Sequence, residues 1–230
     1  MDANEAAALT PRTIAAFIDH TLLAPEAQPA RIEALCAESV RHGFFGVCVN
    51  PCHLPRVVRL LAGQSPVPIA AVGFPLGATL ARVKAYEAGE CASIGAREID
   101  MVLNLAWLKA GDREAVVRDI AAVVRAAAPL PVKVILETCL LSEEEKIQAC
   151  WLAFEAGAAF VKTSTGFAKG GAELEDVRLL RRCVDEISGG VMGVKASGGI
   201  KSFAQAKALI EAGASRIGSS ASLRIVGGKE

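Results

Sequence analysis

The stretch SEEEKIQACWLAFEAGAAFVKTST, residues 142–165, decides the fold because it holds a helix, a helix stop and a buried strand in succession. Ser142 followed by Glu145 is a capping-box pattern that opens a helix, and Gly157 suits the residue just past its end. The short apolar run that follows is typical of a strand buried on both faces. The fragment Glu-Ala-Gly-Ala recurs at 211–214, again directly before an apolar run. The chain therefore repeats a helix-strand unit.

The same alternation continues outward in both directions. Helical patterns over Arg113–Ala127, over 142–156, and from Ser202 to just before Gly213 lie between short apolar runs. These runs are 17–22, 46–50, 68–74, 98–104, 132–137, 160–165, 193–197 and 215–218. Eight strands alternating with helices indicate a (β/α)8 barrel. We predict the α/β class and a single TIM-barrel domain over residues 1–230, with a short N-terminal helix. The alternative is an open doubly wound sheet, which usually carries a GxGxxG or Walker-type turn that this sequence lacks.

The bulk composition limits the classes of partner. The 25 basic and 25 acidic residues balance, so no charge footprint predicts binding to nucleic acid or to an anionic membrane surface. No apolar run approaches the roughly 20 residues that span a bilayer, and the first ten residues lack the basic region of a secretory signal. Seven scattered cysteines, an odd number, suit reduced thiols. We therefore expect a cytoplasmic protein.

One segment of the sequence resembles a metal-binding site. Cys48, Cys52 and His53 lie close together in the sequence, but they lack the CxxC spacing and a second ligand pair. The other histidines, His20 and His42, fall in no ligand-like array. Packed thiols are the simpler interpretation, and we expect neither a metal nor another cofactor.

Two lysines end apolar strands at the position where a barrel does its chemistry. Lys162 lies in FVKTSTG and Lys195 in GVKASGG, so each precedes a small, polar, glycine-containing loop. Active sites of such barrels lie at the carboxyl ends of the strands. A single lysine there often only extends its ammonium to water. Two on consecutive strands indicate a shared function.

A lysine pair is a means of making a nucleophilic amine. An ordinary lysine, with a pKa of about 10.4, is protonated at neutral pH and cannot attack a carbonyl. A second ammonium about 4 Å away makes protonation less favourable by roughly 4 kcal/mol at an effective dielectric near 20. This corresponds to about three pKa units, and burial acts in the same direction. Either lysine of the pair could be the one that attacks.

Acidic residues within the apolar strands are candidate partners. Asp100 lies in the middle of EIDMVLN, where a buried carboxylate needs a counter-charge. It is either a general acid/base or a structural counter-ion. Asp19 is a weaker case of the same kind. Lys133 sits at a strand start, the opposite end of the barrel, and is assigned a structural role. Glu137 either lines the site or takes part in catalysis.

Glycine-rich loops follow the last two strands. SGGIKS at 197–202 leads into a helix, and GSS occupies 218–220. Glycines let the backbone approach an anion, and N–H groups at a helix start donate to it. Barrels often bind phosphate at this position, so we predict a phosphate site.

Seven segments together resemble the deoxyribose-phosphate aldolase family. They are IDHTLL at 18–23, VCVNP at 47–51, VGFPLGA at 72–78, EIDMV at 98–102, FVKTSTGF at 160–167, VKASGGI at 194–200 and RIGSS at 216–220. The resemblance implies a lyase with a barrel fold that reversibly cleaves 2-deoxy-D-ribose 5-phosphate to D-glyceraldehyde 3-phosphate and acetaldehyde, in deoxyribose catabolism. Its class I chemistry needs no metal, because a protonated imine withdraws the electrons. The implied partners are the sugar phosphate and the aldehyde, and a homodimer or homotetramer is the expected assembly.

The resemblance also assigns roles. It implies that Lys162 forms the Schiff base, that Lys195 is the proton donor or acceptor that keeps it reactive, and that Asp100 is a further proton donor or acceptor. Asp19 resembles a residue that contacts a substrate hydroxyl. The segments that resemble the substrate and phosphate cradle contain Thr165, Gly166, Gly198, Gly199, Gly218 and Ser219.

Two positions depart from the family pattern. Phe167 stands where some members carry a basic residue, so Lys201 or Lys169 is expected to supply the charge. Ser219 replaces a frequent threonine and keeps the hydroxyl. Two other functions stay open: a phosphosugar isomerase with Asp100 or Glu137 as base, and a non-catalytic barrel that binds a phosphate ligand.

Overall fold

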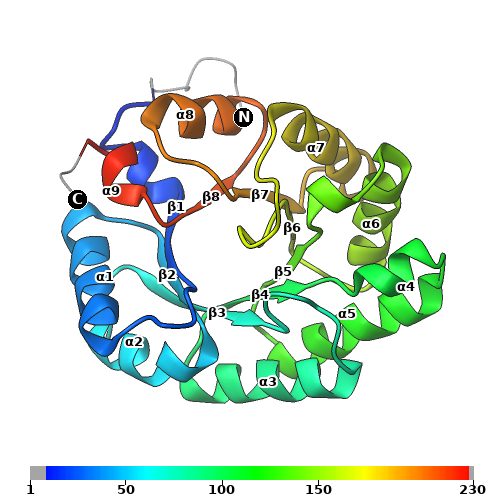
Figure 1. The fold of residues 1–230 in the computed structure, drawn as a ribbon, viewed down its shortest axis with the longest axis horizontal. Helices are drawn as coiled ribbons and strands as arrows, with labels where there is room; N and C mark the ends of the chain where they lie inside the picture. The colour runs from blue at the N-terminus through cyan, green and yellow to red at the C-terminus, as the bar shows by residue number, and fades with distance from the viewer. Residues whose placement is uncertain (1–8, 228–230) are drawn as a thin grey trace.

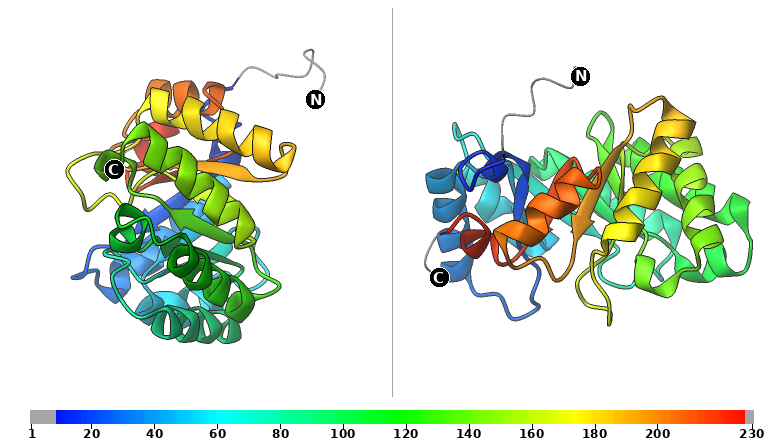
Figure 2. Two further views of the ribbon diagram at one scale, coloured as in Figure 1. Left: turned by 90° about the vertical axis from the view of Figure 1, so that its right-hand side faces the viewer. Right: turned by 90° about the horizontal axis from the view of Figure 1, so that it is seen from above.

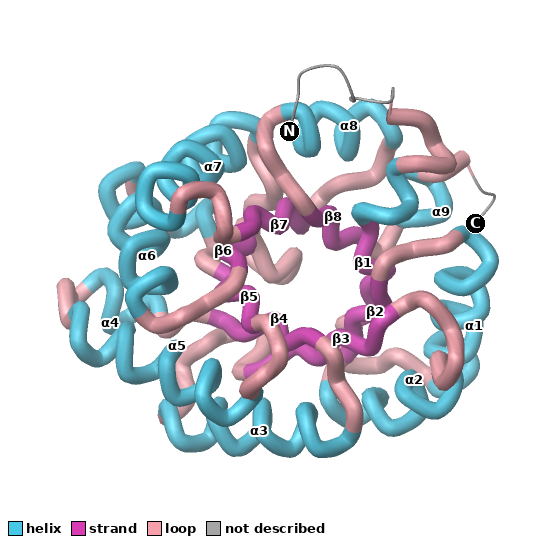
Figure 3. The backbone as a smooth tube through the Cα atoms, turned by 180° about the vertical axis from the view of Figure 1, so that it is seen from behind, coloured by secondary structure: helices cyan, strands magenta, loops and turns pink. Residues whose placement is uncertain are grey.

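The structure is a computed structural model, and it describes residues 9–227. The described strands form one closed parallel barrel in chain order, each pairing with the next and the last with the first (Figures 1 and 3). The strands are β1 Ile18–Leu22, β2 Gly46–Val49, β3 Val67–Val72, β4 Glu98–Val102, β5 Val132–Ile135, β6 Phe160–Lys162, β7 Gly193–Ser197 and β8 Arg216–Ser219. The predicted TIM barrel is confirmed, and every predicted strand overlaps an observed one.

Helices surround the strands on the outside (Figure 2). The α-helices are α1 Pro29–His42, α2 Leu54–Leu60, α3 Ala81–Ile94, α4 Leu105–Lys109, α5 Arg113–Ala127, α6 Glu143–Glu155, α7 Leu174–Ser188, α8 Phe203–Glu211 and α9 Ser222–Ile225. The 3-10 turns are η1 Ile14–Phe17, η2 Pro51–His53 and η3 Thr138–Leu140. The expected N-terminal helix is the turn η1. None of the described helices is long and apolar enough to cross a membrane, and the predicted absence of a secretory signal falls largely on residues 1–8, outside the described range.

Local sequence signals fix the helix starts. Ser142 accepts a hydrogen bond from the backbone N–H of Glu145, whose side chain in turn accepts from the N–H of Ser142. Asp112 and Ser202 also cap α5 and α8, where their side chains accept from the backbone N–H groups of Ala115 and Gln205. These caps satisfy backbone donors that have no partner inside the helix. The predicted starts are therefore confirmed.

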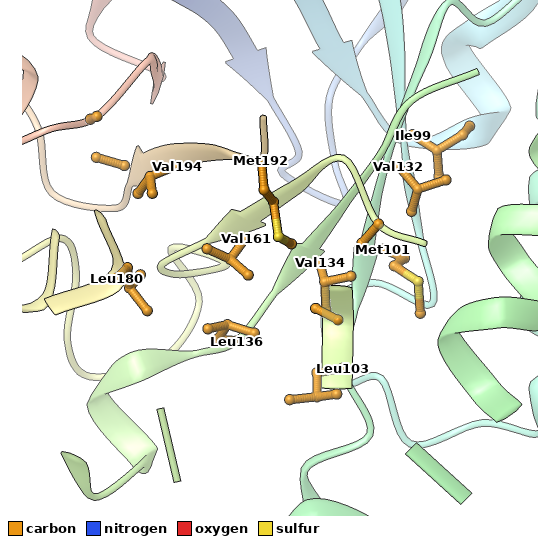
Figure 4. Close-up of a cluster of buried hydrophobic side chains, with 14 of the residues drawn as sticks. Ile99, Met101, Leu103, Val132, Val134, Leu136, Val161, Leu180, Met192 and Val194 are labelled. Carbon is orange, nitrogen blue, oxygen red and sulfur yellow. The ribbon is translucent and has the colours of Figure 1, made fainter. Parts of the chain in front are cut away.

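The apolar core lies between the strands and the helices. Outward side chains of β4 to β7, such as Met101, Val134 and Val161, are fully buried against α5, α6 and α7 (Figure 4). Because successive strand residues alternate faces, the residues between them point into the barrel. Those inward positions hold most of the buried charges.

One buried ion pair lies outside the barrel and was not foreseen. Lys84 of α3 and Asp119 of α5 are both fully buried, 2.5 Å apart. Lys84 Nζ also donates to the carbonyl of Val102 at 3.1 Å. The pair ties two neighbouring helices to the end of β4.

Candidate active site

A cavity of about 260 Å³ opens at the carboxyl ends of the strands. Figure 1 shows the loop from β6 to α7, in yellow, reaching over the barrel opening. The predicted residues that line the cavity are Lys162, Thr165, Gly166, Gly198, Gly199, Gly218 and Ser219. The structure therefore brings together residues from three strand ends that the sequence separates widely.

Below the cavity, six charged side chains form a ring of alternating sign. In order round the ring they are Asp100, Lys133, Glu98, Arg216, Asp19 and Lys195. Adjacent members are between 2.5 and 3.1 Å apart, from Lys195–Asp19 at one extreme to Arg216–Glu98 at the other. All six are buried. A buried charge is unfavourable without a partner, and here each charge has two of opposite sign.

Lys162 is a seventh charge attached to this ring. Its Nζ lies 2.8 Å from Asp100 Oδ2, the oxygen that also accepts from Lys195 Nζ at 2.7 Å. The ring contains three cations and three carboxylates, so a protonated Lys162 leaves the group with one surplus positive charge. A neutral Lys162 leaves it balanced. Of the seven, Lys162 is the group that also lines the cavity.

The pKa directions agree with this charge count. Burial lowers the pKa of Lys162 and Lys195 lowers it further, although Asp100 opposes both. Burial also acts to lower the pKa of Lys195, but Asp100 and Asp19 outweigh it and raise that pKa above its usual value. The pair therefore divides into an amine that loses its proton more readily and an ammonium that keeps it. The sequence does not distinguish the two lysines, and their surroundings favour Lys162 as the neutral amine.

Asp100 is held as a carboxylate. Burial by itself raises its pKa, but Lys133, Lys162 and Lys195 together bring it well below the usual range. Lys133 enters from the amino end of the barrel, as expected, yet its ammonium reaches Asp100 Oδ1 at 2.8 Å. Lys133 therefore has its structural role in direct contact with the predicted catalytic carboxylate.

Two predicted acidic residues have other partners than expected. Asp19 lies in the ring rather than in the cavity lining, and its two oxygens accept from Lys195 and Arg216. Glu137, left open between lining and catalysis, accepts hydrogen bonds from the backbone N–H and the hydroxyl of Thr165. It thereby holds the loop after β6 in place.

Glu98 and Arg216 are the charged residues that sequence reasoning missed. Each begins a strand, and each lies two positions before a residue already singled out, Asp100 or Gly218. This spacing puts them on the inward face. The signal was present, but it was hidden because charged residues at strand ends are usually exposed.

Cys48 and Cys52, which are close in the sequence, have different surroundings in the structure. Cys48 points into the barrel, with its Sγ 3.9 Å from Asp100 Oδ2, and burial raises its thiol pKa to about 11. Cys52 is exposed. Across residues 9–227 no three His, Cys, Asp or Glu side chains are placed to hold a metal ion.

The loops of the predicted phosphate cradle depend on glycine. Gly166, Gly198 and Gly199 have φ values of 85°, 92° and 75°, a region that favours glycine. A Cβ on Gly218 would lie 3.0 Å from Lys195 Cε, so this glycine also makes room for the lysine. Lys201 lines the cavity beside these loops, as one of the two lysines expected to supply charge to an anion there.

The two departures from the family pattern have distinct surroundings. Phe167 lines the cavity and packs edge-on against Phe74, with ring centroids 5.2 Å apart. Lys169 is exposed. Ser219 donates from its hydroxyl to the carbonyl of Ile200 at 2.7 Å and so links the two glycine-rich loops.

A closed (β/α)8 barrel with a buried lysine of lowered pKa beneath glycine-rich loops has the features of a lysine-dependent aldolase. The chain belongs to the DeoC/LacD family of aldolases, whose family model matches residues 13–226. It is similar to the deoxyribose-phosphate aldolase of Brevibacillus brevis, with 53% identity over 92% of this chain and 94% of that one.

Solved structures agree in fold. A protein from Coccidioides immitis that carries the same enzyme name provisionally is 40% identical, with a TM-score of 0.93 over 95% of this chain and 86% of that one. The deoxyribose-phosphate aldolase of Aeropyrum pernix, described as a tetramer, is 33% identical, with a TM-score of 0.88 over 95% of this chain and 91% of that one.

Proposed function

We propose that this chain is a class I deoxyribose-phosphate aldolase that cleaves 2-deoxy-D-ribose 5-phosphate through a Schiff base on Lys162. The observation that carries the proposal is the position of Lys162, the surplus cation of a buried charge ring and the charged member of that group that faces the cavity. The high identity to deoxyribose-phosphate aldolases supports the choice of substrate.

The reaction begins with the neutral Lys162 Nζ attacking the C1 aldehyde of the open-chain sugar. Loss of water from the resulting carbinolamine gives a protonated imine, and the C3 hydroxyl then loses its proton. The C2–C3 bond breaks, its electron pair moves toward the imine, and D-glyceraldehyde 3-phosphate leaves. Protonation of the enamine at C2 and hydrolysis release acetaldehyde and regenerate the amine.

The proton transfers fall to the groups nearest the amine. Asp100 is ionised and lies against Lys162 Nζ, so it accepts protons and returns them. The Lys195 ammonium donates to the same oxygen of Asp100, which lets it supply the proton needed when water departs. Both groups are in place before substrate arrives, which reduces the reorganisation that the reaction requires.

The glycine-rich loops after β7 and β8 would hold the phosphate. Both loops line the cavity, and with them Ser220 and Lys201, whose hydroxyl and ammonium can donate to an anion as backbone N–H groups do. Lys162 lines the same cavity, so one phosphorylated substrate can contact both Lys162 and the phosphate-binding loops. A cytoplasmic location and a homodimer or homotetramer complete the proposal, the latter supported by the tetrameric relative.

Trapping tests the Schiff base directly. Borohydride added with acetaldehyde or deoxyribose 5-phosphate should attach the substrate carbons to Lys162, as mapped by peptide mass spectrometry. A Lys162→Met variant should give no adduct and no turnover, while Lys169→Met, which removes an exposed lysine from the loop after β6, should still give the adduct at Lys162. An isomerase or a binding protein would give no adduct at Lys162, and that result would refute the proposal.

A further inference from the structure

The amino end of the barrel, called its floor below, carries the two members of the charge ring that lie farthest from the cavity. Glu98 and Arg216 are the first residues of β4 and β8, at the amino ends of the strands. The guanidinium Cζ of Arg216 lies 3.2 Å from the ring centroid of Phe45, and the ring of Phe160 lies 5.8 Å away. Gly193 makes room for Phe160, because a Cβ there would collide with the Phe160 ring. Aromatic rings therefore close this end of the barrel and hold the guanidinium in place.

We propose that Arg216 and Glu98 are positioning residues that hold the charge balance beneath Lys162 and so set the pH at which its amine becomes reactive. The inference rests on the proposed Schiff-base role of Lys162. Neither residue is among those that line the cavity, so neither contacts the reacting atoms in the described structure. They act through the ring.

Two hydrogen-bonded paths join the floor to the amine. Arg216 holds Asp19 at 3.0 Å, and Asp19 holds Lys195 at 2.5 Å. Glu98 holds Lys133 at 2.6 Å, and Lys133 holds Asp100 at 2.8 Å. Both paths end on a group that contacts or neighbours the Lys162 amine. A change at the floor therefore alters both the charge and the placement of the groups around that amine.

The charge count gives each floor residue an effect of opposite sign. Without Arg216, the remaining ring has three carboxylates and two cations, so protonation of Lys162 restores balance and is favoured. Without the Glu98 charge, the ring already has one surplus cation, so protonation of Lys162 is disfavoured. A residue that only supported the fold would not produce opposite shifts.

Most strands bring a titratable group toward Lys162, and the charges of these groups act on its amine together with those of the floor residues. They are Asp19 of β1, Cys48 of β2, Glu98 and Asp100 of β4, Lys133 of β5, Lys195 of β7 and Arg216 of β8, with Glu137 after β5 bound to the loop above. The inward residue of β3 beside Asp100 is Ala71. No other described strand residue adds a charge to the ring, so the balance can be tested by substitution at the floor.

The experiment measures the pH dependence of Lys162 alkylation by acetaldehyde with cyanoborohydride, alongside kcat/KM for deoxyribose 5-phosphate. Arg216→Met should move the midpoint of alkylation upward, and Glu98→Gln should move it downward. Each shift should be roughly one pH unit for a charge about 10 Å away at an effective dielectric near 20. The double variant should return close to the wild type, and Arg216→Lys, which keeps the charge, should leave the midpoint unchanged.

The outcomes separate this inference from the proposed function. Absence of a Lys162 adduct in the wild type refutes the Schiff base itself. A wild-type adduct with midpoints that stay fixed, or that move in the same direction in both variants, overturns only the role of the floor. Circular dichroism and thermal melting establish folding, and if Arg216→Met does not fold, the near-isosteric Glu98→Gln decides: a lower midpoint supports the inference and any other result overturns it.

Discussion

Replacing Lys195 by methionine should make Lys162 harder to deprotonate. In the native protein the pKa of Lys162 is lowered, so the reactive amine fraction rises with pH through that pKa and is lost below it. Lys195 is fully buried and shares Asp100 Oδ2 with Lys162. Methionine keeps much of the side-chain shape and removes the charge. The three remaining cations, with Lys162 protonated, would then balance the three carboxylates.

The size of the shift follows from the shared oxygen. Hydrogen bonds of 2.8 and 2.7 Å to one atom, at a roughly tetrahedral angle, put the two nitrogens about 4.5 Å apart. At an effective dielectric near 20 the repulsion is roughly 4 kcal/mol, or between two and three pKa units. At a pH below both midpoints, alkylation of Lys162 should therefore fall by a few hundred-fold.

Alkylation of Lys162 by acetaldehyde and cyanoborohydride is the suitable assay, because it reports the amine without requiring complete turnover. The rate should be followed from about pH 5 to 10. The matched control replaces another buried lysine together with its partner, Lys84→Met with Asp119→Leu, since an apolar pair often substitutes well for a buried ion pair. The control should keep the wild-type midpoint. A midpoint in Lys195→Met that stays in place or moves to lower pH would refute the coupling.

Three further substitutions test other parts of the structure. Gly218→Ala places a methyl group 3.0 Å from Lys195 Cε. We expect kcat to fall by about tenfold or more with little change in melting temperature. An unaltered kcat would show that the Lys195 side chain has room to move. Ser142→Ala removes the cap of α6 and should lower the free energy of unfolding by about 1 kcal/mol, measured by urea denaturation, without affecting kcat/KM. Phe167→Lys adds a cation at the cavity and should lower KM for deoxyribose 5-phosphate but not for unphosphorylated deoxyribose; an equal change for both would place this side chain away from the phosphate.

The sequence was sufficient to predict the barrel, because the strand and helix signals are local. It was less accurate at strand ends. The run predicted to reach Asn104 ends at Val102, since the Asn104 side chain caps α4. The run predicted to reach Thr165 ends at Lys162, and the Thr163 hydroxyl that follows donates to the carbonyl of Ser197 and accepts from its N–H. Side-chain bonds of this kind do not appear in a pattern of hydrophobicity.

The charge ring was beyond sequence reasoning for a different reason. The lysine pair and Asp100 were recognised as unusual within apolar strands. Which of these charges pair with one another was not evident, because the contact of Lys195 with Asp19 joins residues 176 positions apart. Only closure of the barrel brings β1 beside β8 and completes the circuit with Arg216. The sequence revealed that charges were buried, and the closed fold determined which charge compensates which.

The aromatic floor and the ring above it have a consequence for how this protein can diverge. A single neutral replacement among Glu98, Lys133 and Arg216 changes the net charge of a buried ring that also governs the Lys162 amine, whereas simultaneous loss of an acid and a base does not. Descendants of this chain should therefore exchange these residues in compensating couples. The surrounding loops, which carry Phe167 and Lys201, are free of that restriction and are the place where new substrate preferences can arise stepwise.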